Sequence, residues 1–346
     1  MNVFRVSVIS ATVIAIAVVS VGQPEALGGP DNAAVLRECA QGQAKIEDMY
    51  RHLQVRGKYM LRNVFMSPAK ERHFNFAFAS NGASQRYSQD VTKDAFEGSE
   101  RTIGSSSVSV ATADLCFRLR RSPDEATYRT LWLGRRDFDQ NCKVVEESLL
   151  DDTMKLRCPY KLDGRVPIAA LLAHPTFAAK LVTRSEKMGV PVVTIGFEAA
   201  PGSGPDDSLR TWRDCGPLTG SFSCIPGLCW AVCDYAFNFR DAYNGDSLEM
   251  QGVVRYAAAT GPPRPQRIEV YGSSRGKACT VEIWDLTDFE DRPADPSEFT
   301  LAAFGLTDAA PPSGGRQHWF WLAAGAMAAL LASVLLRALA RRRATA

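Results

Sequence analysis

The chain has 346 residues, and its 40 basic and 38 acidic residues leave a formal net charge of +2. Six of the basic residues flank two apolar stretches at the ends, so the part between them carries a small net negative charge. A domain without a basic excess lacks the electrostatic footprint of a nucleic-acid-binding protein, and this excludes nucleic acid as a partner. The length allows one or two domains with a large core.

Residues 1–22 have the layout of a secretory signal peptide. Arg5 is the only charge ahead of an apolar run over residues 6–21, which is short for a helix that spans a bilayer. Small residues just before residue 23 favour cleavage after Gly22, and an uncleaved anchor is the alternative. A signal of this kind predicts that the rest of the chain is exported.

Residues 32–53 predict an amphipathic helix that lies on another layer of the fold. Asp31 stands at the position expected for its N-cap. The apolar residues that recur at helical spacing are Val35, Leu36, Cys39, Ile46, Met49, Tyr50 and Leu53.

The hydrophobic period changes from 3.6 to 2 after this helix, which indicates strands. Apolar and basic residues alternate over residues 55–65, and Phe74, Phe76 and Phe78 alternate with smaller or polar residues in the next stretch. Further strands are expected at residues 108–112, 115–119 and 128–133.

The middle of the chain predicts a helical insert at residues 167–187, broken at Pro175. The strand pattern returns at residues 190–199 and again at 230–240 and 248–256, where Asn244 and Gly245 are a typical hairpin turn. Residues 267–272 and 279–286 continue the up-and-down series.

Four of the nine cysteines, Cys215, Cys224, Cys229 and Cys233, lie within nineteen residues. Their spacing fits neither a zinc knuckle nor a C-x-x-C redox site, and thiols tend to pair outside the cytoplasm. We therefore expect at least two of them to form a disulfide, with unpaired buried thiols as the alternative. Because nine is odd, at least one cysteine stays free or bonds to another chain.

Residues 318–337 predict a single transmembrane helix. The eighteen residues 319–336 carry no charge, Trp319 and Trp321 mark one end, and Arg337 begins a group of four arginines at the other. Since positive charge stays inside, the tail at residues 338–346 is expected in the cytoplasm. A linker at residues 307–317 then joins the membrane to an exported domain at residues 23–306, on the outer side of the cell (inner) membrane.

These elements predict an α+β fold: a long curved antiparallel sheet of the half-barrel kind, an amino-terminal helix and a mid-chain helical insert as its lid, and one carboxy-terminal transmembrane helix. Their order over residues 31–306 resembles the bacterial lipoprotein-carrier (Lol) superfamily. The resemblance implies an apolar cavity between sheet and helices. It implies no transport role, because a tethered chain cannot diffuse between membranes, and no functional residue of the carriers matches a position in this sequence.

Candidate contacts to an apolar ligand lie on the apolar face of the strands: Tyr59, Leu61, Phe74, Phe76, Phe78, Phe117 and Phe237. Plain core packing under the lid is the competing interpretation. Arg118, Arg120 and Arg121, together with Arg135 and Arg136, are a candidate rim for lipid head groups, and solvated strand faces would also explain them.

Catalytic, cofactor-binding and metal-binding residues are not predicted. The sequence has no H-E-x-x-H pair, and its G-x-S-x-G match at residues 272–276 falls in the turn between two predicted strands, whereas a nucleophile elbow joins a strand to a helix. The pattern favours a membrane-anchored, periplasmic-side module that is not an enzyme and uses no cofactor. Its expected ligand is a lipid, a lipoprotein or another protein of the envelope. The alternatives are an envelope hydrolase and a structural subunit of an envelope complex.

Overall fold

A computed structural model describes residues 30–65, 68–95, 103–135, 140–200, 217–240 and 245–307. The chain divides into two compact units, residues 1–296 and 297–346. The first unit contains an antiparallel sheet of 13 strands, which confirms the predicted α+β class and the long antiparallel sheet. The sheet is not closed, since β6 (Arg129–Arg135) and β9 (Ala178–Lys187) are its two edges.

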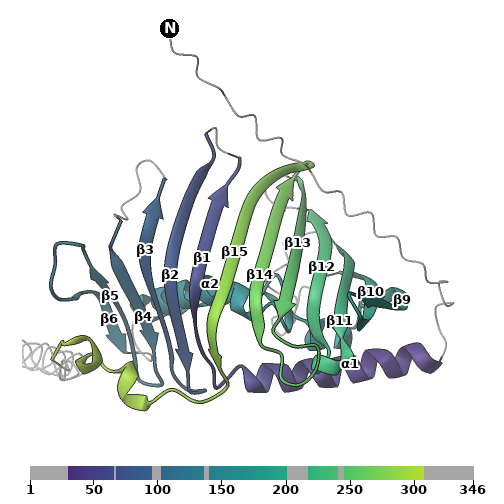
Figure 1. Ribbon diagram of the computed structural model, residues 1–346, viewed down its shortest axis with the longest axis horizontal. Helices are drawn as coiled ribbons and strands as arrows, with labels where there is room; N and C mark the ends of the chain where they lie inside the picture. The colour runs from purple at the N-terminus through teal and green to yellow at the C-terminus, as the bar shows by residue number, and fades with distance from the viewer. Residues whose placement is uncertain are drawn as a thin grey trace, which may run out of the picture. The chain divides into compact units, whose positions relative to one another are not determined.

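Two up-and-down series of strands meet at the centre of this sheet (Figure 1). The first series runs outward from the centre and consists of β1 (Gln54–Asn63), β2 (Lys70–Ser80), β3 (Gln85–Asp94), β4 (Ser106–Ala111), β5 (Leu115–Arg121) and β6. The second starts at β9 and returns through β10 (Val190–Ala199), β11 (Leu218–Ile225), β12 (Ala231–Arg240), β13 (Ser247–Tyr256), β14 (Pro265–Ser274) and β15 (Lys277–Glu290). β15 pairs with β1, with Tyr59 opposite Trp284.

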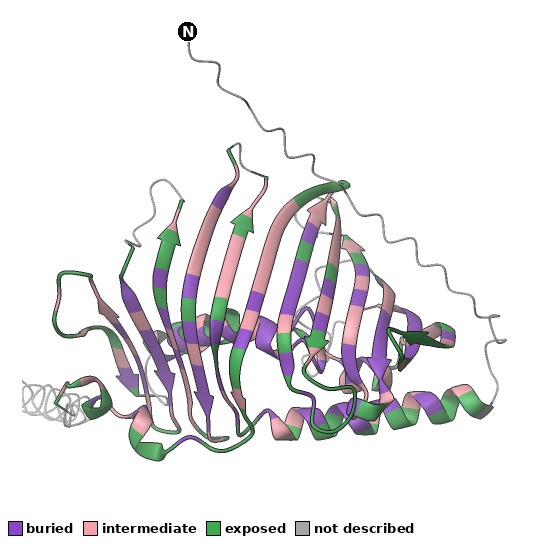
Figure 2. Ribbon diagram, in the orientation of Figure 1, coloured by how far each residue is buried: buried purple, intermediate pink, exposed green. Residues whose placement is uncertain are grey.

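Alternating burial along the strands explains why these segments form a sheet. Figure 2 shows buried and exposed residues following one another along most strands, as expected when one face packs on a core and the other meets water. In β2, Phe74, Phe76 and Phe78 are buried, while Asn75 between them is exposed. The predicted strands at residues 55–65, 108–112, 115–119 and 128–133 correspond to β1, β4, β5 and β6.

Two helices cover the apolar face of the sheet, which we call the covered face. α1 (Pro30–Met49) packs against α3 (Ile168–Ala173) and β12, and α2 (Gln140–Thr153) packs against β3 to β6. The predicted amino-terminal helix is thus present. It begins at Pro30, so Asp31 lies in its first turn and is not its N-cap. Proline suits a first helical turn because its missing N–H needs no partner there.

The helical insert predicted at residues 167–187 is correct only in its first part. α3 is six residues long, and residues 178–187 form the edge strand β9. The second cover of the sheet is instead α2, followed by the 3₁₀ turn η1 (Met154–Arg157) and the small ribbon of β7 (Lys161–Leu162) and β8 (Val166–Pro167). Another 3₁₀ turn, η3 (Pro226–Leu228), connects β11 to β12.

The ends of the chain carry four predicted segments that lie outside the described residues: the signal peptide at 1–22, the linker from residue 308 onward, the transmembrane helix at 318–337 and the tail at 338–346. Across the ranges that are described, none of the helices has both the length and the apolar composition to cross a bilayer. The described carboxy-terminal residues form the 3₁₀ turns η4 (Pro296–Phe299) and η5 (Ala302–Phe304), and the second of these ends at Gly305 with a positive φ of 72°.

Candidate functional site

Six of the seven predicted ligand residues share the covered face. Directly paired strand residues lie on the same side of a sheet, and the pairs Tyr59–Phe74, Leu61–Glu282 and Phe237–Met250 are in register. Phe117 is the exception. It pairs with Val110 and lies on the opposite face, because its neighbours Cys116 and Arg118 are the residues that contact α2.

The aromatic residues at the centre of the covered face pack against one another. The ring of Tyr59 stacks on Phe74 and on Trp284, with centroids 5.3 and 4.2 Å apart, and Phe76 meets Trp284 edge-on at 4.8 Å. Phe74 and Phe76 are buried, whereas Tyr59 is half-buried. Ring pairs at these separations are typical of a filled aromatic core. The structure therefore brings these residues together, and their stacked rings leave no space for a ligand between them.

A cluster of charged residues is buried beside these rings. Lys155 of η1 donates a hydrogen bond to Asp163, and its Nζ lies 3.8 Å from Oε1 of Glu282 on β15. The hydroxyl of Tyr59 donates to Oε2 of Glu282 over 3.3 Å, and Nε of Arg165 lies 3.8 Å from Asp163. Burial raises the pKa of Glu282, and the nearby Lys155 opposes this shift.

Two members of this cluster are closed to solvent, whereas the side chain of Glu282 is 19% exposed. The side chains of Lys155 and Asp163 are 3% and 2% exposed, and each charge has an opposite charge beside it. Asp163 also has a positive φ of 52°, so the turn between β7 and β8 holds it in a strained conformation. The arrangement holds η1 and the β7–β8 ribbon on the sheet, and the carboxylate of Asp163 is out of reach of a substrate.

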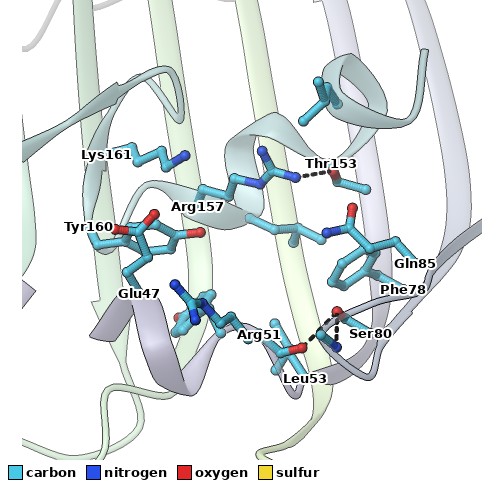
Figure 3. A pocket seen from close by; sticks show the side chains of 14 residues that line it. Glu47, Arg51, Leu53, Phe78, Ser80, Gln85, Thr153, Arg157, Tyr160 and Lys161 are labelled. Atoms are coloured by element: carbon cyan, nitrogen blue, oxygen red, sulfur yellow. Dashed lines mark hydrogen bonds between the residues drawn. The ribbon is translucent and has the colours of Figure 1, made fainter. Parts of the chain in front are cut away.

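An open pocket of about 230 Å³ lies where the end of α1, the α2–η1 segment and the β2–β3 hairpin meet (Figure 3). Its apolar lining comes from Leu53, Phe78 and Leu156, together with the rings of Tyr50 and Tyr160, which pack edge to face at 5.3 Å. Phe78 is the one predicted ligand residue that lines it. The volume is below the range of about 300–1,000 Å³ that is usual for sites enclosing a drug-sized molecule.

Three cations and one carboxylate stand around this pocket: Arg51, Arg157, Lys161 and Glu47. Figure 3 shows Arg157 and Lys161 on one side of it and Arg51 on another. Nη2 of Arg157 donates to Oγ1 of Thr153 over 3.5 Å, and Nζ of Lys161 lies 5.4 Å from the ring centroid of Tyr160. Arg51 lies 3.7 Å from Asp48 in an exposed pair.

Burial and the excess of positive charge in the lining both shift the pKa values of pocket residues. Burial lowers the pKa of Lys161, the positive charge of Arg157 lowers it further, and the carboxylate of Glu47 opposes these two effects. Burial also raises the pKa of the Tyr160 hydroxyl to about 12, against the opposing effect of Arg157, so the hydroxyl is protonated at neutral pH. The pocket therefore combines an apolar lining with an excess of hydrogen-bond donors.

The pocket could not be predicted from the local pattern of the sequence, because its residues come from three separate stretches of the chain. The candidate rim at Arg118, Arg120 and Arg121 does not form on one surface: Arg118 and Arg120 lie on the covered face and Arg121 on the other. Arg118 donates to Ser148 of α2 over 2.9 Å, and Arg121 donates to Ser106 over 3.2 Å.

The cysteine cluster is described from Cys224 onward, and Cys215 lies outside the described residues. Cys224, Cys229 and Cys233 are free thiols in the structure. Burial raises the pKa of Cys233 to about 12, with Asp234 adding to the effect. Sγ of Cys39 on α1, which is not part of the cluster, lies 4.0 Å from Sγ of Cys224. The disulfide stays a prediction.

Comparisons with known proteins find similarity in structure only. No family model matches the sequence, and no curated protein matches it. A putative outer membrane lipoprotein-sorting protein domain from Vibrio parahaemolyticus is similar at a TM-score of 0.39 and 9% identity, over 78% of this chain and 98% of that one.

Two other solved structures are similar over a comparable length. A LolA superfamily protein from Nitrosomonas europaea has a TM-score of 0.34 and 11% identity, over 78% of this chain and 96% of its own. LprF from Mycobacterium bovis has a TM-score of 0.33 and 10% identity, over 79% and 97%. Structures with lipoprotein-sorting and LolA superfamily titles are thus among those to which this chain is similar. At these scores it assigns no ligand to any residue of this chain.

Proposed function

We propose that the protein is a membrane-anchored, exported binding module that is not an enzyme and holds part of an amphiphilic lipid in the pocket beside Phe78. The observation that supports this most directly is the combination of an apolar lining with a cationic opening in one pocket. Sites for amphiphiles need both, because the chain is held by burial and the head group by polar contacts.

The size of the pocket limits what it holds. At about 230 Å³ it takes a head group or a short length of one chain, and the rest of a lipid stays outside. Such partial binding suits a module that presents a lipid or a lipoprotein to a neighbour in the membrane. Export and anchoring rest on the apolar stretches at residues 6–21 and 319–336 and on the arginines that follow the second.

The envelope hydrolase has less support. Titratable groups do converge at Lys155, Asp163 and Glu282, but Lys155 and Asp163 are buried, and Lys155 pairs with both carboxylates. A general acid or base must come within hydrogen-bond reach of a substrate.

Native mass spectrometry of the full chain, extracted from membranes in a mild detergent, tests the proposal. Leu150 of α2 lines the pocket and is 47% exposed, so Leu150→Trp obstructs the site with little effect on the core. Val144 on the same helix is 44% exposed and does not line the pocket, so Val144→Trp is a matched control.

We expect a lipid mass on the wild-type chain and on the Val144→Trp variant, and its loss or strong reduction in Leu150→Trp. Equal lipid occupancy in all three chains would mean that the lipid binds outside this pocket. A wild-type chain that neither carries a lipid nor takes one up on titration would overturn the proposed function.

A further inference from the structure

We infer that the pocket selects single-chain amphiphiles whose head group carries a negative charge, either a carboxylate or a phosphate. This inference rests on the proposed function, because it names the ligand class of the same pocket. It is carried by the three cations at the opening, of which Arg51 pairs with Asp48, whereas Arg157 and Lys161 have no carboxylate at ion-pair distance in the described ranges.

The first step is the balance of charge around the opening. Arg51, Arg157 and Lys161 face a single carboxylate, that of Glu47, in the lining of the pocket. A ligand that enters from solvent therefore meets a positive field. Such a field raises the local concentration of anions and disfavours cations.

The second step is the number of unused hydrogen-bond donors. A guanidinium has five N–H donors and an ammonium has three. Arg157 uses one of its donors on Thr153 over 3.5 Å, and Lys161 lies over the ring of Tyr160 at 5.4 Å. Within the described ranges neither side chain has a carboxylate at ion-pair distance. The donors that remain match the oxygen atoms of a carboxylate or a phosphate.

The third step is the effect of the cations on one another. Burial disfavours the charged form of Lys161, the positive charge of Arg157 disfavours it further, and the carboxylate of Glu47 opposes both without reaching ion-pair distance. An anion bound between the two side chains would remove this repulsion and supply the missing partner. A neutral head group would supply hydrogen-bond acceptors without the charge, and a cationic one would add to the repulsion.

The fourth step is the number of chains. The apolar lining formed by Leu53, Phe78 and Leu156 belongs to a pocket of about 230 Å³, which is less than the usual minimum of about 300 Å³ for sites that enclose a whole small molecule. One aliphatic chain can enter beside the head group, and a second chain would have to stay in water or in the membrane.

The test compares head groups at constant chain length. The full chain is reconstituted in phosphatidylcholine nanodiscs, and binding of dodecanoate, dodecyl phosphate, dodecanol and dodecyltrimethylammonium is measured by calorimetry, with inorganic phosphate as the probe without a chain. We expect at least one of the two anionic amphiphiles to bind about tenfold or more tightly than dodecanol, since a charge-assisted hydrogen bond has about this effect. The preference should decrease as salt is added.

Variants connect the preference to the two cations. Arg157→Gln and Lys161→Gln should each weaken binding of the anionic amphiphile about tenfold and leave dodecanol unaffected. Lys143 of α2 is 78% exposed, pairs with Glu147 and does not line the pocket, so Lys143→Gln should change nothing. Circular dichroism and thermal unfolding establish that each variant is folded, and Arg157→Lys serves as a second, conservative variant that should retain part of the preference.

The outcomes separate the two proposals. If dodecanol binds as tightly as dodecanoate and dodecyl phosphate, the head-group inference is wrong and the lipid-binding function stands. If no amphiphile binds, or inorganic phosphate binds as tightly as dodecyl phosphate, the proposed function itself is overturned. Tight binding of dodecanoate alone identifies a fatty-acid carboxylate as the source of the charge, and tight binding of dodecyl phosphate alone identifies a lipid phosphate.

Discussion

Sγ of Cys39 on α1 lies 4.0 Å from Sγ of Cys224 on β11, and both residues are completely buried. The two sulfur atoms are in contact without a covalent bond, since a disulfide requires about 2.05 Å. Around them the helix approaches the β11–β12 connection closely. Gln43 donates a hydrogen bond to the carbonyl of Trp230, and Gly42 faces the carbonyl of Cys229. Cys229 and Trp230 both have positive φ values, 55° and 65°.

Gly42 allows this close approach, which gives a first prediction. A Cβ added at residue 42 would lie 2.5 Å from the carbonyl oxygen of Cys229, a distance that forces the helix or the turn to move. Gly42→Ala should therefore lower the free energy of unfolding by about 1–3 kcal/mol, although alanine favours a helix by about 1 kcal/mol over glycine. Urea denaturation measures the change, with Gln41→Ala at an exposed position of the same helix as the control. A Gly42→Ala variant more stable than the wild type would contradict the described packing.

Thiol labelling gives a second prediction. Cys39 and Cys224 should resist maleimide in the native protein, because both are fully buried, while the partly exposed Cys279 should react. All three should react in denaturant. Mass spectrometry of labelled peptides measures this, and rapid native labelling of Cys39 would show that α1 does not stay on the sheet. The same samples also test the predicted disulfide. If it is present, the denatured protein should show two more labelled thiols with reductant than without it.

The buried cluster around Lys155 gives a third prediction. Lys155→Met leaves the carboxylates of Asp163 and Glu282 without their shared cation, so we expect a loss of about 3–5 kcal/mol in the free energy of unfolding. Lys143→Met removes an exposed lysine and should stay within about 0.5 kcal/mol of the wild type. Chemical denaturation measures the free energy of unfolding of both variants. If the two are equally stable, the cluster around Lys155 does not stabilise the fold.

The pH dependence of stability gives a fourth prediction. The pKa of Glu71 is lowered to about 2, because its carboxylate accepts hydrogen bonds from His73 at 2.6 Å and Lys93 at 2.8 Å. A lowered pKa in the folded state means that the carboxylate stabilises the protein above its ordinary pKa of 4.5, and that this contribution is lost as the pH falls toward 2. The stability difference between the wild type and Glu71→Gln should therefore shrink from pH 5 to pH 2. A difference that is constant over that range would be inconsistent with the hydrogen bonds of Glu71.

Strands with a clear apolar face were predictable from the sequence, and elements whose buried positions are polar were not. The alternation of Phe74, Phe76 and Phe78 indicated β2 directly. β3 escaped prediction because Gln89, between Tyr87 and Val91 on the covered face, is itself buried and interrupts the apolar pattern. Gln89 donates to Ser107 over 3.1 Å, which accounts for a polar side chain at that position.

The cover of the sheet was predicted only in part. α2 carries several acidic residues, yet Cys142, Val145 and Leu149 are buried at helical spacing and could have indicated it. Residues 178–187 look helical because alanine and basic residues dominate them, but an edge strand tolerates the same composition when one face is solvated. The pocket depends on contacts between distant segments, and no local period of the sequence encodes such contacts.

The pairing of β1 with β15 has a consequence for how this protein is made. Tyr59 and Glu282 are joined across the middle of the sheet although 223 residues separate them along the chain. Hairpins on either side can form while the polypeptide is still emerging, but this central pairing must wait until β15, the last strand of the sheet, has been synthesised. Closing so long a loop is entropically costly and slow. During that interval two half-sheets expose unpaired strand edges, so biogenesis should be most sensitive to chaperones and to aggregation just before β15 arrives.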